Sequence, residues 1–419
     1  MASQPLRQLF TVLHGCIKGG NLNRALRLLV TNLPRTGGNY LLRRYVADTL
    51  LALDRPREAA EVYEILVRHF TNIGKPLIAV SIAKRLAEIE PDIGGHLDHI
   101  ASVYANQSPF LEDDESARLE RADNLEAALD LSGTEPDLPQ EALAGVAHEL
   151  ALRKDGFASS PDAVPPILLL SQLDVNTLRR VLGSLEPRFF ADEQPLLERG
   201  MAPSEVLWVV SGRLRVTTAN EEVGKLRSEA LLGHSLIFNA APPPAVVSAT
   251  TVGHVEALAL PSDVIVELRK ERKLVAAAAQ LDLAARVDFA VSACGLFDSV
   301  PEDARASVFR RFTPCLVPSD TVLIPEGGLG RGIWLVVAGK VDVNKQQDDF
   351  DMTVKTLGPG EVIGEISLVT EGPAVATVVT DGPSRLLYMG RDDFMATCDR
   401  FPEILDKVRE AAASRLLER

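Results

Sequence analysis

The second half of this sequence repeats itself with an offset of 127 residues, and this repeat restricts the fold more than any other feature. One register holds, without an insertion, over more than forty residues. The matching positions are Leu169 and Leu296, Pro187 and Pro314, Leu196 and Leu323, Gly200 and Gly327, Val209-Val210 and Val336-Val337, and Gly212 and Gly339. A register kept over this length predicts a duplicated domain of about 125 residues.

Each copy is predicted to be an antiparallel β-roll or jelly roll flanked by helices. Short β-prone runs are separated by Gly, Pro, Asp or Asn, which is typical of such folds. These runs are 205–210, 213–218 and 246–251 in the first copy, and 321–324, 332–337, 340–344, 352–357, 376–379 and 384–389 in the second. Helical stretches at 261–290 and 391–417 close the copies. We assign residues 167–290 to the first domain and 291–419 to the second.

Residues 1–155 are predicted to form a separate α-helical domain. Apolar residues recur at helical spacing, and breakers divide the segment into paired helices. Residues 40–91 fit a period near 34 best, so the region resembles a tetratricopeptide-like solenoid, with an unrelated helical bundle as the alternative. Residues 108–117, which include the acidic stretch 112–115, are interpreted as a solvated loop rather than a metal site. Residues 117–131 are predicted to form a helix, and residues 156–166 have the composition of a linker. The predicted fold class is therefore multidomain α + β, a helical solenoid followed by two β-rolls.

One stretch of the second copy, residues 360–378, has the composition of an anion site. Gly364-Glu365 is predicted to begin a short helix, whose backbone N–H groups attract phosphate. Gly372-Pro373 forms a turn, and the place where a cation is expected holds Ala374. The earlier run 327–332 is also rich in glycine, but it lacks the Lys-Ser/Thr of a P-loop and precedes a strand. We interpret that run as a strand connection.

At these residues the sequence resembles the cyclic nucleotide-binding domain. The resemblance covers residues 166–419, about 60% of the chain. Its marks are Leu323-Ile324-Pro325-Glu326-Gly327, Ile333-Trp334-Leu335-Val336-Val337-Ala338-Gly339, Gly364-Glu365-Ile366-Ser367-Leu368 and Gly372-Pro373-Ala374-Val375-Ala376-Thr377-Val378. The resemblance implies a β-roll with a phosphate-binding cassette. The implied nucleotide pocket of the second domain consists of Gly364, Glu365, Ile366, Ser367, Ala374 and Val375.

The resemblance also implies a role for each cassette residue. The cassette Glu accepts a hydrogen bond from the ribose 2′-hydroxyl, and an Arg after Gly-Pro, followed by a hydroxyl residue, pairs with the cyclic phosphate. Glu365 matches the Glu, whereas Ala374 and Val375 replace the Arg and the hydroxyl residue. Removing one partner of such a sheltered pair costs about 2–5 kcal/mol, which is tens- to thousands-fold in affinity. The first copy departs further, with His234 for the Glu and prolines at 242–244.

Composition argues against several classes of function. A formal net charge of −14 and a pI near 5.1 do not suit a nucleic-acid or anionic-membrane surface. No apolar run is long enough to span a bilayer and the start lacks a signal-peptide pattern, so we expect a cytoplasmic protein. The four scattered cysteines indicate reduced, buried thiols rather than a disulfide frame or zinc site. No catalytic or metal-ligand motif stands out.

Two functional hypotheses follow from these patterns. The first is a non-enzymatic signalling adaptor that binds a protein partner through residues 1–155. Its two degenerate β-rolls would not bind cAMP or cGMP in the usual mode, so no cofactor is expected. The alternative is a regulatory sensor whose second β-roll binds a cyclic mono- or dinucleotide, with Glu365 on a ribose. Neither reading involves nucleic acid or membrane insertion, and homo-oligomer formation stays open.

Overall fold

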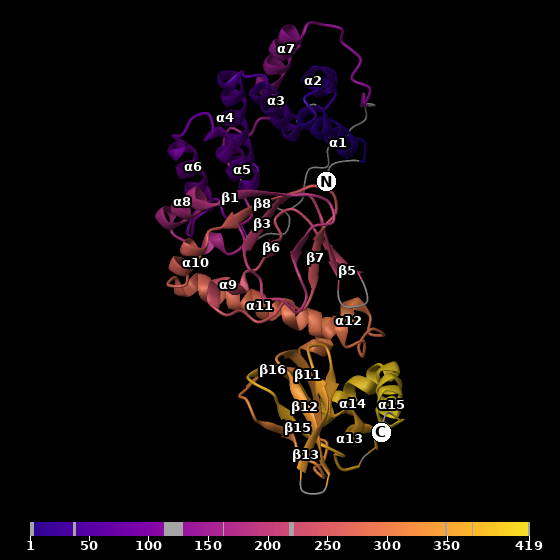
Figure 1. Cartoon of the computed structure of the whole chain (residues 1–419). Coiled ribbons are helices and arrows are strands. Elements are labelled where there is room, and N and C mark those ends of the chain that lie inside the picture. The colour runs from indigo at the N-terminus through magenta and orange to yellow at the C-terminus, as the bar shows by residue number, and fades with distance from the viewer. Residues whose placement is uncertain are drawn as a thin grey trace. The chain divides into compact units, whose positions relative to one another are not determined.

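The computed structural model describes residues 4–36, 39–112, 129–161, 163–217, 222–347, 350–370 and 372–417. It divides into two compact units, Met1–Ala278 and Ala279–Arg419 (Figure 1). The chain combines α-helices and β-strands, with helices in the N-terminal region and antiparallel sheets beyond it, as predicted. Residues 113–117 of the predicted loop over 108–117, and most of the predicted helix over 117–131, lie outside the described residues. No helix within these ranges has the length and apolar composition needed to cross a bilayer.

The helices of the N-terminal region begin where the sequence supplies start signals. The described helices are α1 (Gln4–Lys18), α2 (Leu22–Thr36), α3 (Tyr40–Ala52), α4 (Pro56–Asn72), α5 (Pro76–Leu86), α6 (Gly94–Tyr104) and α7 (Gln140–Leu152). Asn39 caps α3 by accepting a hydrogen bond from the Leu42 N–H at 3.1 Å. Pro56 and Pro76 occupy first-turn positions, where a missing N–H costs nothing. The tetratricopeptide-like arrangement and the linker bounds remain predictions.

The segment that follows α7 is fastened to α3 and α4 around His69. The His69 ring stacks on Tyr40 with ring centroids 3.6 Å apart, and its Nδ1 accepts the Ala158 N–H at 3.2 Å. Asn72 donates to the Ala158 carbonyl at 2.9 Å. Burial, and to a lesser degree the Arg43 guanidinium, lower the pKa of His69 to about 4. The packing therefore selects the neutral imidazole.

This lowered pKa predicts a loss of stability in mild acid. In the unfolded chain His69 takes up a proton below about pH 6.5, whereas the folded chain resists it down to about pH 4. The free energy of unfolding should therefore fall by about 2–3 kcal/mol as the pH drops through this window. Urea titrations at a series of pH values measure the slope, and His69→Gln should flatten it. An equally steep slope in His69→Gln would assign the acid sensitivity to other groups.

The first β-roll consists of two four-stranded antiparallel sheets. One has the order β1 (Glu186–Phe190), β8 (Val255–Leu260), β3 (Val206–Ser211), β6 (Leu231–Leu232), and the other β2 (Pro195–Leu197), β7 (Ser248–Thr251), β4 (Leu214–Thr217), β5 (Glu222–Leu226). Alternate residues of β3 face opposite sides, so Leu207 and Val209 join the interior of the roll. Trp208 points outward yet is fully buried, and its Nε1 donates to the Leu168 carbonyl at 3.3 Å.

A buried carboxylate joins the helical region to the outer face of this roll. Glu256 lies on β8 and is 7% exposed. Arg44 of α3 donates both terminal nitrogens to its carboxylate, at 2.9 and 3.1 Å, and the Ser81 hydroxyl of α5 donates to it as well. Burial is the largest single influence and raises the pKa of Glu256, but the charge of Arg44 and the hydrogen bonds from Arg44 and Ser81 together outweigh it, so the net pKa is lowered. The ionised carboxylate therefore fixes the helices on the roll.

The second unit contains a pair of sheets with the corresponding strand order. One sheet has the order β9 (Thr313–Val317), β16 (Ser384–Gly390), β11 (Gly332–Ala338), β14 (Val362–Ile363), and the other β10 (Val322–Ile324), β15 (Thr377–Thr380), β12 (Val341–Gln347), β13 (Phe350–Leu357). The helices of this unit are the end of α11 (Arg272–Ala293), α12 (Glu302–Phe309), α13 (Glu365–Thr370), α14 (Arg391–Arg400) and α15 (Pro402–Leu417). Figure 1 shows α13, α14 and α15 beside the sheets.

Two helices predicted as continuous are each interrupted. The stretch 261–290 forms α10 (Ser262–Leu268) and then α11, and the Arg269 side chain at the break donates to the Leu236 carbonyl at 2.9 Å. The stretch 391–417 forms α14 and α15, because Pro402 cannot continue a helix but starts one well. All four cysteines are free, but only Cys16 and Cys398 are buried, so the expectation of uniformly buried thiols is wrong.

Glu256 in the first roll and Arg385 in the second occupy equivalent places in their paired strands. Glu256 is opposite Ser211 in the first roll, and Arg385 is opposite Ala338 in the second. Ser211 and Ala338 are separated by the repeat offset of 127 residues. A terminal nitrogen of Arg385 lies 3.9 Å from the carboxylate of Asp282 on α11. Corresponding positions therefore carry opposite charges.

Candidate functional site

The cassette of the second roll is shaped by a glycine in a left-handed conformation. Gly364 follows β14 with a φ of +91° and precedes α13. A Cβ at this position would lie 2.6 Å from the carbonyl oxygen of Gly332 on β11. Only glycine meets both conditions without strain. The close approach holds the start of α13 against the sheet. The short helix itself begins at Glu365, as the Gly364-Glu365 pattern predicts.

We expect Gly364→Ala to lower the free energy of unfolding of the second unit by about 1–3 kcal/mol, from backbone strain and the contact with Gly332. Chemical denaturation followed by circular dichroism measures this loss. Gly382→Ala is the matched control, because Gly382 has a φ of +93° with open space around its Cβ position. Equal losses in the two variants would mean that the contact contributes nothing beyond the strain.

The six predicted pocket residues do not share one environment. Glu365 and Ser367 are buried, at 3% and 6% exposure. Ala374 is 8% exposed and belongs to an apolar cluster with, among others, Val336 and Leu386. The remaining predicted residues are Gly364, at the turn just described, half-buried Ile366, and Val375, which is 36% exposed.

The backbone of Ala374 is also fully engaged. Its N–H donates to the Gly328 carbonyl at 2.7 Å, and its carbonyl accepts the Gly327 N–H at 2.7 Å. A bridge between Leu329 and Pro373 continues this pairing. The glycine-rich run 327–332 therefore pairs with the cassette and leads into β11. The place predicted for a phosphate-binding cation is thus a methyl group in an apolar core, with neither backbone group left for a ligand.

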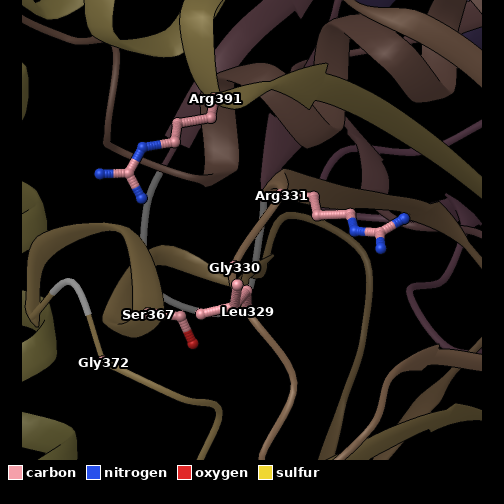
Figure 2. A pocket seen from close by; sticks show the side chains of 6 residues that line it. All are labelled: Leu329, Gly330, Arg331, Ser367, Gly372 and Arg391. Carbon is pink, nitrogen blue, oxygen red and sulfur yellow. The ribbon is translucent and has the colours of Figure 1, made fainter.

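A cavity of about 340 Å³ lies beside α13. Two arginines, a serine, two glycines and a leucine line it: Arg331, Arg391, Ser367, Gly330, Gly372 and Leu329. Of the six predicted pocket residues, only Ser367 lines this cavity. Figure 2 shows Arg391 above Ser367 and Arg331 to the right, with Leu329 and Gly330 beside Ser367. The arginines were not predicted as site residues, because they lie 60 positions apart and gave no motif.

In the corresponding segment of the first roll, the glycine backbone approaches its neighbour more closely than at Gly364. Gly233, with a φ of +69°, is so close to β3 that a Cβ would lie 1.9 Å from the Glu205 carbonyl oxygen. His234 follows and precedes the short helix α9 (Ser235–Phe238). The prolines at 242–244 lack N–H groups, so this turn offers an anion few donors. Within the ranges described for the whole chain, no cluster of three or more His, Cys, Asp or Glu side chains could hold a metal ion.

Residues 315–401 match the sequence model of the family described as cyclic nucleotide-binding domain. The chain contains a cyclic nucleotide-binding domain. The match includes β11, the cassette and α14, so the resemblance in the second copy is confirmed. The matched segment lies within the predicted second domain.

Two curated proteins are similar to part of this chain. The Cyclic AMP receptor protein of Thermus thermophilus is 33% identical over 117 residues, which are 28% of this chain and 53% of that protein. The CRP-like cAMP-activated global transcriptional regulator of Mycobacterium tuberculosis is 26% identical over 131 residues, 31% of this chain and 58% of that protein. The chain thus spans little more than half the length of these two relatives.

A solved structure similar to the chain is the regulatory domain of Toxoplasma gondii PKA with cAMP. Its sequence identity is 19%, and the alignment covers 59% of this chain and 92% of that chain with a TM-score of 0.28. By their names, the two sequence relatives are a receptor and a transcriptional regulator. The cyclic nucleotide-binding domain of this chain is therefore similar to domains of regulatory proteins.

Proposed function

We propose that this chain is a non-enzymatic regulatory protein whose cyclic nucleotide-binding domain lacks the cation that holds a cyclic phosphate. The similarity to a cyclic AMP receptor and a cAMP-activated regulator supports a regulatory role. The observation that carries the rest is Ala374, buried in an apolar cluster with both backbone groups bonded to the run 327–332. A phosphate placed there would lose its hydration and gain no charged partner.

The proposal also treats the first β-roll as a copy of the same domain that has changed more than the second β-roll has. Its strand order corresponds to that of the second roll. His234 stands at the position of Glu365, and prolines occupy the turn. Both rolls would then act as structural modules that position other surfaces of the protein.

Calorimetry of the full chain with cAMP and with cGMP tests whether cyclic-nucleotide binding has been lost. We expect no binding at about 1 mM nucleotide, the concentration at which a binding free energy of about −4 kcal/mol gives half saturation. A micromolar dissociation constant for either nucleotide would overturn the proposal.

The effector surface in this proposal is the N-terminal helical region, which binds a protein partner. Arg44 and Ser81 of that region donate hydrogen bonds to Glu256 of the first roll. The experiment therefore uses the full chain and not the isolated helical region. Cross-linking in a cell extract, followed by mass spectrometry, locates the contact. Partner cross-links should gather on lysines of the helical region, which include Lys18, Lys75, Lys84 and Lys154. Cross-links confined to Lys340, Lys355 and Lys407 would place the partner elsewhere.

A sensor function is the second candidate, and the buried Glu365 favours it. This carboxylate lies at the start of α13, directly after Gly364 with its φ of +91°. In this candidate it accepts from a ribose hydroxyl of a cyclic mono- or dinucleotide bound in an altered mode. A panel of nucleotides should then raise the melting temperature of the wild-type chain but not of Glu365→Gln. If no nucleotide raises the melting temperature, this candidate is ruled out.

A further inference from the structure

Another cavity, of about 400 Å³, lies at the edge strand β9 of the second roll. Its lining comes from two segments, residues 316–318 and residues 383–385. Leu316 on β9 and Arg385 on β16 are opposite each other in the strand register. Residues paired in this way project from the same face of a sheet, with their Cβ atoms about 4.5–5.5 Å apart. The register therefore places a cation beside an apolar side chain at this cavity.

The Arg385 guanidinium lies near a carboxylate that does not use its hydrogen-bond donors. Asp282 on α11 is 3.9 Å from a terminal nitrogen of Arg385, which is beyond hydrogen-bond distance. The same oxygen of Asp282 accepts from Arg286 at 2.9 Å. Within the part of the chain that the structure describes, no acceptor takes a hydrogen bond from the Arg385 side chain, which is 34% exposed. A guanidinium has several N–H donors, so those of Arg385 can serve a ligand.

The rest of the cavity wall is largely apolar. Two aliphatic side chains and two prolines line it, all of them half-buried or exposed: Leu316, Val317, Pro318 and Pro383. Leu316 is 79% exposed, and its neighbours extend it into one apolar patch beside the cation. Ser384 is buried and its hydroxyl donates to the Lys340 carbonyl at 3.2 Å, so this residue forms wall rather than a further donor.

The first roll shows how a charge at this register position is satisfied. There Glu256 accepts two hydrogen bonds from the guanidinium of Arg44, at 2.9 and 3.1 Å. Arg385 occupies the equivalent place with the opposite charge, and Asp282 forms no such two-point pair with it. The two oxygens of a carboxylate match the fork of a guanidinium. The group that suits Arg385 is therefore a carboxylate.

We propose that this cavity binds a small carboxylic acid with an apolar body. The carboxylate accepts a pair of charge-assisted hydrogen bonds from Arg385, and the apolar body lies against Leu316 and the two prolines. A volume of about 400 Å³ is in the range of small-molecule pockets. Because Asp282 accepts from Arg286, its negative charge has a cation beside it and repels the ligand less. This inference does not rest on the proposed function, because no residue of the cassette lines the cavity.

Calorimetry of the full chain with phenylacetate, phenylacetamide and acetate tests the site. Phenylacetate is expected to bind with a dissociation constant of about 1 mM or tighter, and less tightly as salt is added. Phenylacetamide keeps the ring without the charge, and acetate keeps the charge without the ring. Each of these two should therefore bind about tenfold more weakly than phenylacetate, or not at all.

Two variants and their matched controls locate the binding. Arg385→Gln should weaken phenylacetate binding about tenfold or more, through loss of the charge-assisted pair. Arg409→Gln on α15 removes the same charge from a side chain that is 60% exposed, and it should bind like wild type. Leu316→Ala should weaken binding about threefold or more, through loss of apolar contact. Val322→Ala on β10 shortens another exposed apolar side chain, 53% exposed, and should have no effect.

Each other outcome counts against the site. No binding of phenylacetate at about 1 mM, or equal binding by Arg385→Gln and Arg409→Gln, overturns it. Equal binding of phenylacetamide overturns the carboxylate assignment, and equal binding of acetate overturns the apolar body. Arg385→Gln also removes the ion pair with Asp282, so its melting temperature is measured beside its binding. Leu316→Ala leaves that ion pair in place and tests the site independently, and titrations with cAMP and cGMP address the proposed function separately.

Discussion

Glu256→Ala is expected to lower the free energy of unfolding of the first unit by about 3–5 kcal/mol. The substitution removes the carboxylate that accepts two hydrogen bonds from the buried Arg44 guanidinium and one from the Ser81 hydroxyl. Arg44 then keeps Asp48, 4.0 Å from its Nε, as a more distant carboxylate. A buried charge that loses its hydrogen-bonded partner costs far more than an exposed one. Urea denaturation, followed by the fluorescence of the buried Trp208, measures the loss.

An exposed ion pair of the same roll supplies the control. Arg215 and Glu193 approach within 2.5 Å, but the Glu193 side chain is 59% exposed. Glu193→Ala should therefore cost less than about 1 kcal/mol. The double variant Glu256→Leu, Arg44→Met should recover much of the loss, because apolar side chains of similar size can replace a buried pair. Similar losses for Glu256→Ala and Glu193→Ala would show that the buried pair is not decisive.

Ala374→Arg is expected to give the second roll a measurable affinity for cAMP. The new guanidinium stands where the family pattern places the phosphate partner, and a sheltered charge pair of this kind is worth about 2–5 kcal/mol. That range corresponds to a gain of tens- to thousands-fold in affinity. Calorimetry of the variant and the wild-type chain under identical conditions measures the gain.

The neighbouring residue provides a matched control for this gain. Val375→Arg adds the same charge at a position that is 36% exposed, outside the apolar cluster that surrounds Ala374. It should increase cAMP affinity only slightly. Because an added side chain in a packed core costs about 1–3 kcal/mol, the melting temperature of Ala374→Arg must be measured beside its binding. A folded Ala374→Arg variant with no gain would mean that more than the cation has been lost.

Local patterns in the sequence were sufficient for the helical N-terminus and for the β-rich second half. Periodic apolar residues, Pro56 and the glycine turns act over a few residues, so they can be recognised without a structure. β8 of the first copy was missed because both of its faces are buried, so Val255–Leu260 shows no alternation. Pro402 indicates the break between α14 and α15, but the predicted helix over 391–417 did not take it into account.

The sites depend on contacts that no local pattern contains. Glu256 and Arg44 are 212 positions apart, and each alone reads as a solvated charge. The cassette motif identified Gly364 and Glu365, and it also marked Ala374 as a departure from the family. It could not reveal that the Ala374 backbone is bonded to residues 327 and 328, or that Arg331 and Arg391 share a cavity. Such pairings arise only when strands and helices meet in space.

The opposite charges of Glu256 and Arg385 bear on how a chain with two similar rolls assembles correctly. During folding, helices that cover one roll could settle on the other, the error that duplicated domains invite. Arg44 brought to the second roll would meet Arg385, and Asp282 brought to the first would meet Glu256. Either exchange places like charges face to face and is penalised. The opposite charges at this position are therefore expected to favour the pairing of each set of helices with its own roll.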